Sequence, residues 1–156
     1  ALPGSGLSVL FDTIRSMHDA GFKNILVLNG HGGNIAPCQG MWGQFLQRRE
    51  INLQFKSYWD FISMEEATPY LETNRFPGHA QEFETAFAMA AFPENIHWEG
   101  VDYEAAKLDI QSETYRPKDP EYFLAGRDFS TPKKGRVMAD VAIDWIAEKM
   151  WSMMAG

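Results

Sequence analysis

The stretch "NILVLNGHGGN", residues 24–34, joins an uninterrupted apolar run to a loop that holds one histidine among three glycines. An apolar run bounded by polar residues and glycine is typical of a strand buried on both faces of a parallel sheet. Ligands of open α/β sheets bind at the carboxyl ends of the strands. The stretch therefore predicts the fold class and also the position of a candidate site.

The segments around this stretch alternate between helical and strand patterns. Apolar residues recur at helical spacing in residues 7–22, and Gly21 provides a stop signal. Residues 35–51, "IAPCQGMWGQFLQRREI", predict a second helix, and residues 52–59, "NLQFKSYW", predict a second strand. This order favours an α/β fold, a three-layer αβα sandwich with a mostly parallel sheet and right-handed crossovers.

The second half of the chain is less regular. Residues 79–92, "HAQEFETAFAMAAF", predict a third helix that begins near His79 or Ala80 and closes at Pro93. Residues 95–131 are interpreted as a long surface excursion. The chain ends in a predicted helix. The residues expected on the inward stripe of this last helix are Val137, Met138, Val141 and Trp145.

Composition limits the functions that this chain can have. The 156 residues fit one domain, and 45% hydrophobic residues are enough for a substantial core. A net charge of −7 argues against nucleic acid or an anionic membrane as partner and favours a small-molecule substrate. A single cysteine, Cys38, cannot build a disulfide framework, and no signal peptide or long apolar segment is visible. We therefore expect a cytoplasmic protein.

His31 is the only side chain of the glycine loop that could readily bind a metal or transfer a proton. The glycines allow a sharp turn and leave backbone N–H groups accessible. The alternative is a tight strand-to-helix turn in which Asn34 is the N-cap and His31 is merely exposed. A phosphate loop is not favoured, because the loop has neither the spacing nor the lysine of the known phosphate-binding motifs.

A second candidate cluster lies in "PGHAQEFET", residues 77–85, where His79, Glu82 and Glu84 open a helix. Helical geometry separates the two glutamates by about 200°, so at most one points directly into a site. Carboxylates are also favoured at a helix N-terminus by the helix dipole, which is the alternative explanation for Glu82. Two loop histidines and a carboxylate suit a hydrolytic Zn, Mn or Fe site, although a binuclear centre needs more ligands.

These motifs resemble the creatininase, or creatinine amidohydrolase, family. The resemblance rests on "GFKNILVLNGHGGN", "SYWDF" and "GHAQEFETAFAMAAFPENI", with "LPGS" near the start of the chain. It implies a creatininase-like fold and a binuclear metal amidohydrolase in which a water bridges two divalent ions. His31 matches the metal-binding histidine of the family's Asn-Gly-His loop, and His79 matches the histidine that shuttles protons. Glu84 matches the glutamate of the family's Glu-Thr-Ser motif, and Trp59 a tryptophan near the substrate.

The candidate residues are grouped by expected role. The catalytic candidates are His79 and Glu82; the metal ligands are His31 and Glu84; the substrate-binding candidates are Trp59, Gly32, Gly33 and Asn34. Which of Glu82 and Glu84 binds the metal is left open.

Two departures from the family pattern affect these expectations. Creatininase itself has a metal-binding glutamate two residues after the loop histidine, where this chain has Gly33. The loop resembles a "GHGGN" branch that includes formamidopyrimidine deformylases, a mycofactocin-maturation peptidase and cyclic-sugar hydrolases, so creatinine is not the favoured substrate. The family's Glu-x-His-Gly-x-His-Leu-Pro segment and its bridging aspartate would lie upstream of "LPGS".

Residues 1–156 are accordingly interpreted as the C-terminal portion of a single creatininase-like domain. Three explanations account for the missing upstream segment: truncation or proteolysis, a split protein whose other chain supplies the ligands, and a degenerate metal-free relative. We favour the first two. The expected function is metal-dependent hydrolysis of cyclic amides or related C–N bonds, with two divalent ions per complete site, in a homo-oligomer, a hexamer. This chain alone is expected to be inactive. The alternative is a non-catalytic fragment or an anion-binding α/β module.

Overall fold

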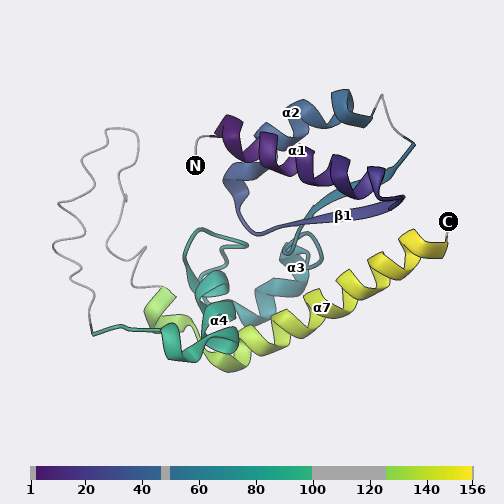
Figure 1. Ribbon diagram of the computed structural model, residues 1–156. Helices are drawn as coiled ribbons and strands as arrows, with labels where there is room; N and C mark the ends of the chain where they lie inside the picture. Colours follow the sequence, from purple (N-terminus) through teal and green to yellow (C-terminus); the bar gives the residue numbers. More distant parts are fainter. Residues whose placement is uncertain (1–2, 47–49, 100–125, 156) are drawn as a thin grey trace. The chain divides into compact units, whose positions relative to one another are not determined.

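A computed structural model describes residues 3–46, 50–99 and 126–155 of the chain (Figure 1). The chain divides into two compact units, which are described separately. The first unit comprises residues 1–61 and 144–156, and the second comprises residues 62–143. Most of the predicted excursion, residues 100–125, lies outside the described residues. The assignment of residues 1–156 to one portion of a single domain stays a prediction.

The first unit contains the predicted alternation of helices and strands. Helix α1 spans Pro3–Asp19, strand β1 Asn24–Asn29, helix α2 Ile35–Leu46 and strand β2 Asn52–Ser57. A single 3-10 turn, Gly32–Asn34, connects the histidine loop to α2. The two strands pair in parallel, as predicted. The parallel pairing confirms the α/β class.

The core of the first unit lies between the sheet and its helices. Ile25 and Leu53 point to the same face of β1 and β2 and pack with Ile14 of α1. Trp42 of α2 contacts Phe55 edge-on, at a ring-centroid distance of 5.6 Å. Figure 1 shows α1 and α2 together over one face of the strands. Because side chains alternate along a strand, one face of β1 is apolar and covered.

The other face of β1 differs from the prediction of a strand buried on both sides. Leu28 is 48% exposed, while Leu26 on the same face is half-buried. The continuous apolar run therefore predicted the strand correctly. It was wrong about burial on both faces, because among the described residues one face of β1 is only partly covered.

The second unit is mainly helical. Helix α3 spans Met64–Ala67 and begins with a capping box, in which Ser63 and Glu66 satisfy each other's backbone N–H groups. Two short 3-10 turns, Thr68–Tyr70 and Pro93–Asn95, follow α3 and α4 respectively. Helix α4 spans Glu82–Ala91.

The start of α4 is later than the sequence predicted. We expected the helix to begin near His79 or Ala80, but Ala80 has a left-handed φ of +50° and Gln81 is extended. Neither conformation belongs to an α-helix. His79 therefore lies on a loop, and Glu82 is the first helical residue.

Helix α7 spans Pro132–Ala155; its residues up to 143 belong to the second unit and the rest to the first. Met138 is buried and Trp145 is half-buried, as the predicted inward stripe requires, whereas Val141 is 44% exposed. The Trp145 ring stacks on Phe61 at a centroid distance of 3.6 Å. Within the described part of the chain, no helix has the length and apolarity needed to cross a membrane.

Candidate functional site

The histidine loop is organised by the last residue of β1. Asn29 is only 5% exposed. Its side-chain amide donates to the His31 carbonyl at 2.9 Å, and its side-chain oxygen accepts from the His31 N–H at 3.2 Å. The same oxygen accepts from the Asn34 side chain at 3.1 Å. Asn29 therefore fixes the backbone of His31 from both sides.

The same asparagine links the loop to the end of β2. Its amide donates to the Ser57 hydroxyl at 3.0 Å, and its backbone carbonyl accepts from the Tyr58 N–H at 3.1 Å. The Ser57 N–H in turn donates to Asp60 at 2.8 Å. Trp59 lies in this second loop, half-buried, and Tyr58 contacts its ring edge-on. His31 and Trp59 thus follow the carboxyl ends of two hydrogen-bonded strands.

Asn29 and Ser57 are residues that the sequence interpretation missed. Their signal was present, because each is the polar residue that ends its strand. They occupy equivalent positions in the register of the parallel pair. A buried polar pair at that position requires mutual hydrogen bonds, since unpaired buried polar groups are costly.

Gly33 gives the His31 side chain the space that it occupies. A Cβ atom at Gly33 would lie 2.7 Å from Nε2 of His31, closer than real contacts allow. At Gly32 a Cβ atom would meet nothing within 4 Å. The exposed His31 ring therefore folds back over the second glycine of the pair. The substrate-binding role predicted for Gly32, Gly33 and Asn34 stays a prediction.

A cavity of about 640 Å³ adjoins the loop within the first unit. It is bounded by the start of α1, the end of β1, the loop and α2; His31, Asn34, Cys38, Leu10 and Phe55 are among its lining residues. Burial raises the pKa of the Cys38 thiol above its ordinary value. This cavity has the size of a small-molecule site.

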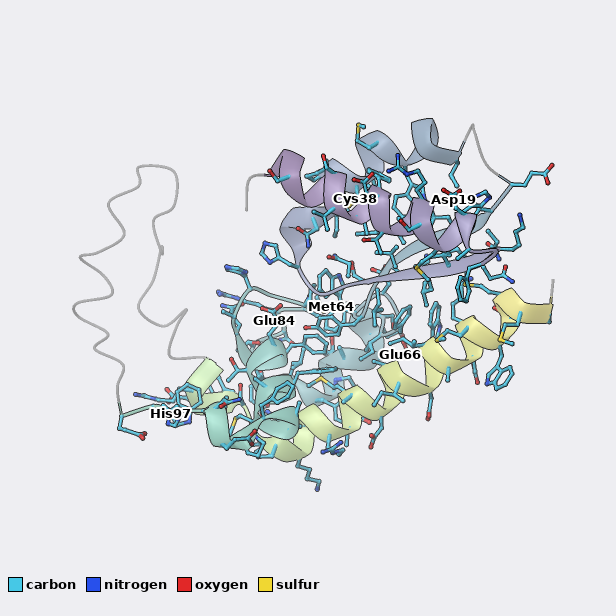
Figure 2. All side chains as sticks on the ribbon, viewed as in Figure 1. Asp19, Cys38, Met64, Glu66, Glu84 and His97 are labelled. Carbon is cyan, nitrogen blue, oxygen red and sulfur yellow. The ribbon has the colours of Figure 1, made fainter. Side chains whose placement is uncertain are left out.

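The second group of candidates lies in the second unit. His79 is exposed on the loop before α4, between Gly78 and Ala80, which both have left-handed φ angles of +75° and +50°. Glu84 is half-buried in the first turn of α4 and accepts a hydrogen bond from the Ala80 N–H. Figure 2 shows Glu84 on this turn. Glu84 thus supports the residue that directly follows His79.

Glu82 has different surroundings from Glu84. It is fully buried, and its carboxylate accepts from the N–H groups of Glu72 and Thr73, the Thr73 hydroxyl and the Lys134 ammonium. Burial acts to raise its pKa, but the hydrogen bonds from Lys134, Thr73 and Glu72 outweigh burial and leave the pKa below its ordinary value. Glu82 is therefore a charged group held inside the unit.

The candidates fall into two groups. His31, Gly32, Gly33, Asn34 and Trp59 belong to the first unit, whereas His79, Glu82 and Glu84 belong to the second. Among the described residues, no group of three or more histidine, cysteine, aspartate or glutamate side chains is placed to hold a metal ion. His31 and Glu84 suit a divalent metal in kind, but these two do not reach the usual number of ligands. His18 and His97 lie outside both groups, beside Asp19 and Glu99 respectively.

The parallel pair β1–β2, with loops at its carboxyl edge and a cavity beside them, defines an α/β protein. The sequence profile of the creatininase family, described as creatinine amidohydrolase, matches residues 5–150. The chain belongs to the creatininase family.

Solved structures agree with this membership at the level of the fold. The crystal structure of a creatinine amidohydrolase (creatininase) is 23% identical, with a TM-score of 0.65 over 95% of this chain and 62% of that one. A structure described as "Creatininase Mn" is 22% identical, with a TM-score of 0.65 over 96% of this chain and 64% of the other. This chain therefore spans less than two thirds of the length of these relatives. No curated protein sequence matches it.

Proposed function

We propose that this chain is part of a metal-dependent amidohydrolase that cleaves the C–N bond of a cyclic amide or a related substrate with an activated water. Membership of the creatininase family over residues 5–150 supports the reaction class. The observation that carries the proposal is the His31 loop, which Asn29 holds by two hydrogen bonds beside a cavity of about 640 Å³. A positioned imidazole at the carboxyl end of a parallel strand is suited to hydrolytic chemistry.

We assign His31 and Glu84 as metal ligands and His79 as the proton-transfer residue. A divalent ion, Zn, Mn or Fe and two per complete site, would supply a hydroxide at neutral pH. Manganese in the description of one structural relative is consistent with such an ion in that protein. Trp59, which follows the end of β2, is assigned to the substrate side of the site. Imidazole and carboxylate side chains are common ligands of these ions, and histidine is a common proton-transfer group, so the residue types fit the assigned roles.

The direct test of the metal assignment is the variant His31→Ala, studied in the full-length protein. Elemental analysis is expected to show loss of bound metal. His97→Ala is the matched control, because His97 is exposed and belongs to neither group of candidates. Equal metal content in the His31 variant and the wild-type protein would overturn the assignment.

The role of His79 is tested separately with His79→Asn. This variant is expected to keep its metal and to lose roughly 10²–10⁴ in turnover, the usual effect of removing a positioned acid or base. A panel of cyclic amides and formylated amines serves as substrate. Loss of metal would make His79 a ligand. Binding of phosphate without metal or hydrolysis would favour an anion-binding module instead.

We also propose that the complete protein is a cytoplasmic homo-oligomer, a hexamer, without nucleic-acid partners. The net charge of −7 supports the last point. Light scattering coupled to gel filtration measures the oligomeric state, and a monomer at micromolar concentration would contradict it.

A further inference from the structure

The loop that carries His79 is closed by a side chain from its own end. Glu82 Oε1 accepts the N–H of Glu72 at 3.1 Å, and Oε2 accepts the N–H and hydroxyl of Thr73, each at 2.9 Å. Both ends of the segment 72–82 therefore meet at one carboxylate, with His79 between them.

The carboxylate is fastened in turn to the beginning of α7. Lys134 Nζ donates to Glu82 at 2.6 Å, to Glu72 at 2.8 Å and to the Phe129 carbonyl at 2.9 Å. The Ser130 hydroxyl donates to the Glu82 carbonyl at 3.0 Å. The lysine side chain is only 18% exposed, and the Glu82 side chain is fully buried. The ammonium thus compensates a carboxylate that has no access to solvent.

The segment between the two ends is conformationally strained. Asn74 and Ala80 both have φ angles of +50°. Asparagine tolerates this conformation, whereas in alanine, which has a Cβ atom and no polar side chain, it costs free energy. Residues in such conformations persist where the surrounding structure imposes them. The Glu82 contacts join the two ends of this segment. Removal of Lys134 would leave the buried carboxylate without its counter-ion and weaken that constraint.

We propose that Lys134 is a positioning residue for His79, acting through Glu82 and the closed loop 72–82. This inference rests on the proposed function of His79, and it deepens that function by adding a residue from a distant helix. It also gives Glu82, which the sequence marked as a catalytic candidate, a part in holding the loop.

The first experiment needs no activity and so stands apart from the proposed function. The variant is Lys134→Met, and Lys133→Met is the matched control, since Lys133 is the exposed neighbour in the same helical turn. Hydrogen exchange is expected to show faster exchange of the Glu72 and Thr73 amides in the Lys134 variant only. The imidazole NMR signals of His79 are expected to shift in the same variant. Unchanged exchange and unchanged His79 signals would overturn the proposal.

The second experiment measures turnover of the panel of cyclic amides and formylated amines. Lys134→Met is expected to lower kcat by roughly 10–10²-fold, as misplacement of a reacting group does, with a smaller change in KM and unchanged metal content. Lys134→Arg keeps the charge and is expected to restore most of the amide protection and most of kcat. An equal loss in kcat with Lys134→Arg, despite restored amide protection, would contradict a positioning role.

A third variant covers the case in which Lys134→Met fails to fold. The double variant Lys134→Met with Glu82→Gln removes the buried charge together with its partner, so no unpaired carboxylate remains in the interior; the Glu72 carboxylate, which also loses Lys134, is 58% exposed. It is expected to fold and to show altered His79 signals. A folded double variant with wild-type His79 signals would overturn the proposal.

Discussion

Asn29 uses its whole side-chain hydrogen-bonding capacity on two loops. Its amide group donates twice, to His31 and to Ser57, and its oxygen accepts twice, from His31 and from Asn34. An amide side chain has two donors and two acceptor positions, so none is left over. The position of His31 therefore depends on one buried residue, and this dependence can be measured.

Replacement of Asn29 by alanine is expected to destabilise the protein by about 2–3 kcal/mol, because several buried groups lose partners. Asn24→Ala, at the opposite end of the same strand, is the control. Asn24 is exposed and accepts one side-chain hydrogen bond, so a change within about 0.5 kcal/mol is expected. Urea denaturation measures both, and equal effects would contradict the role given to Asn29.

Gly33→Ala is expected to displace the His31 ring while leaving stability within about 1 kcal/mol of the wild type. The new Cβ atom would lie 2.7 Å from Nε2, and the end of a flexible side chain can move away. The His31 imidazole NMR signals are expected to shift and metal affinity to fall. Gly32→Ala is the matched control, since its Cβ atom would meet nothing within 4 Å. Identical signals in both variants would refute this geometry.

At the scale of elements, helices α4 and α7 come into close contact at Gly135. A Cβ atom at Gly135 would lie 1.8 Å from the Ala86 carbonyl oxygen and 3.0 Å from the Ala90 Cβ atom. Arg136 adds a hydrogen bond to the Ala90 carbonyl at 3.2 Å. The two small alanines and the glycine permit this contact. The same contact brings Lys134 within reach of Glu82.

Gly135→Ala is expected to destabilise the protein by about 3 kcal/mol, because the obstructing atoms are backbone and the helices must separate. Gly40→Ala in α2 is the control, with nothing within 4 Å of its Cβ atom. There alanine should stabilise the helix by up to about 1 kcal/mol. Thermal unfolding is expected to show a lower Tm for Gly135→Ala and a higher Tm for Gly40→Ala. An unchanged Tm for Gly135→Ala would disprove the close contact.

Elements with a clear apolar period were predictable, and those that depend on distant contacts were not. The strands β1 and β2 and the helices α1, α2 and α7 follow the expected patterns. The start of α4 was wrong because the left-handed Ala80 is an alanine, a residue that local sequence rules place inside a helix. The burial of Glu82 also escaped prediction, because its partner Lys134 lies 52 residues away in the chain.

At the scale of the whole molecule, the end of the chain returns to the unit that contains its beginning. Residues 144–156 belong with residues 1–61, and the stack of Trp145 on Phe61 is a contact between these two parts. The apolar stripe of the last helix predicted that Trp145 would pack inward, but no local pattern could identify Phe61 as its partner. The candidate residues were likewise proposed from their motifs, and their roles stay predictions, whereas the division of the chain into two units had no signal in the sequence.

Trp145→Ala is expected to destabilise the protein by about 2–3 kcal/mol, because a half-buried tryptophan and an aromatic pair are lost. Trp151→Ala on the same helix is the control. Trp151 is 69% exposed, so its loss should change stability by no more than about 0.5 kcal/mol. If both variants unfold at the same urea concentration, the stacked pair does not contribute to stability.

The contact between Lys134 and Glu82 also sets an order of events during synthesis. Lys134 follows Glu82 by 52 residues, so a nascent chain that has not yet reached α7 lacks the ammonium that compensates this carboxylate. Closing a segment of this length costs entropy, which the contacts formed at its end offset. The ion pair that holds the Glu82 carboxylate can therefore form only after Lys134 has left the ribosome.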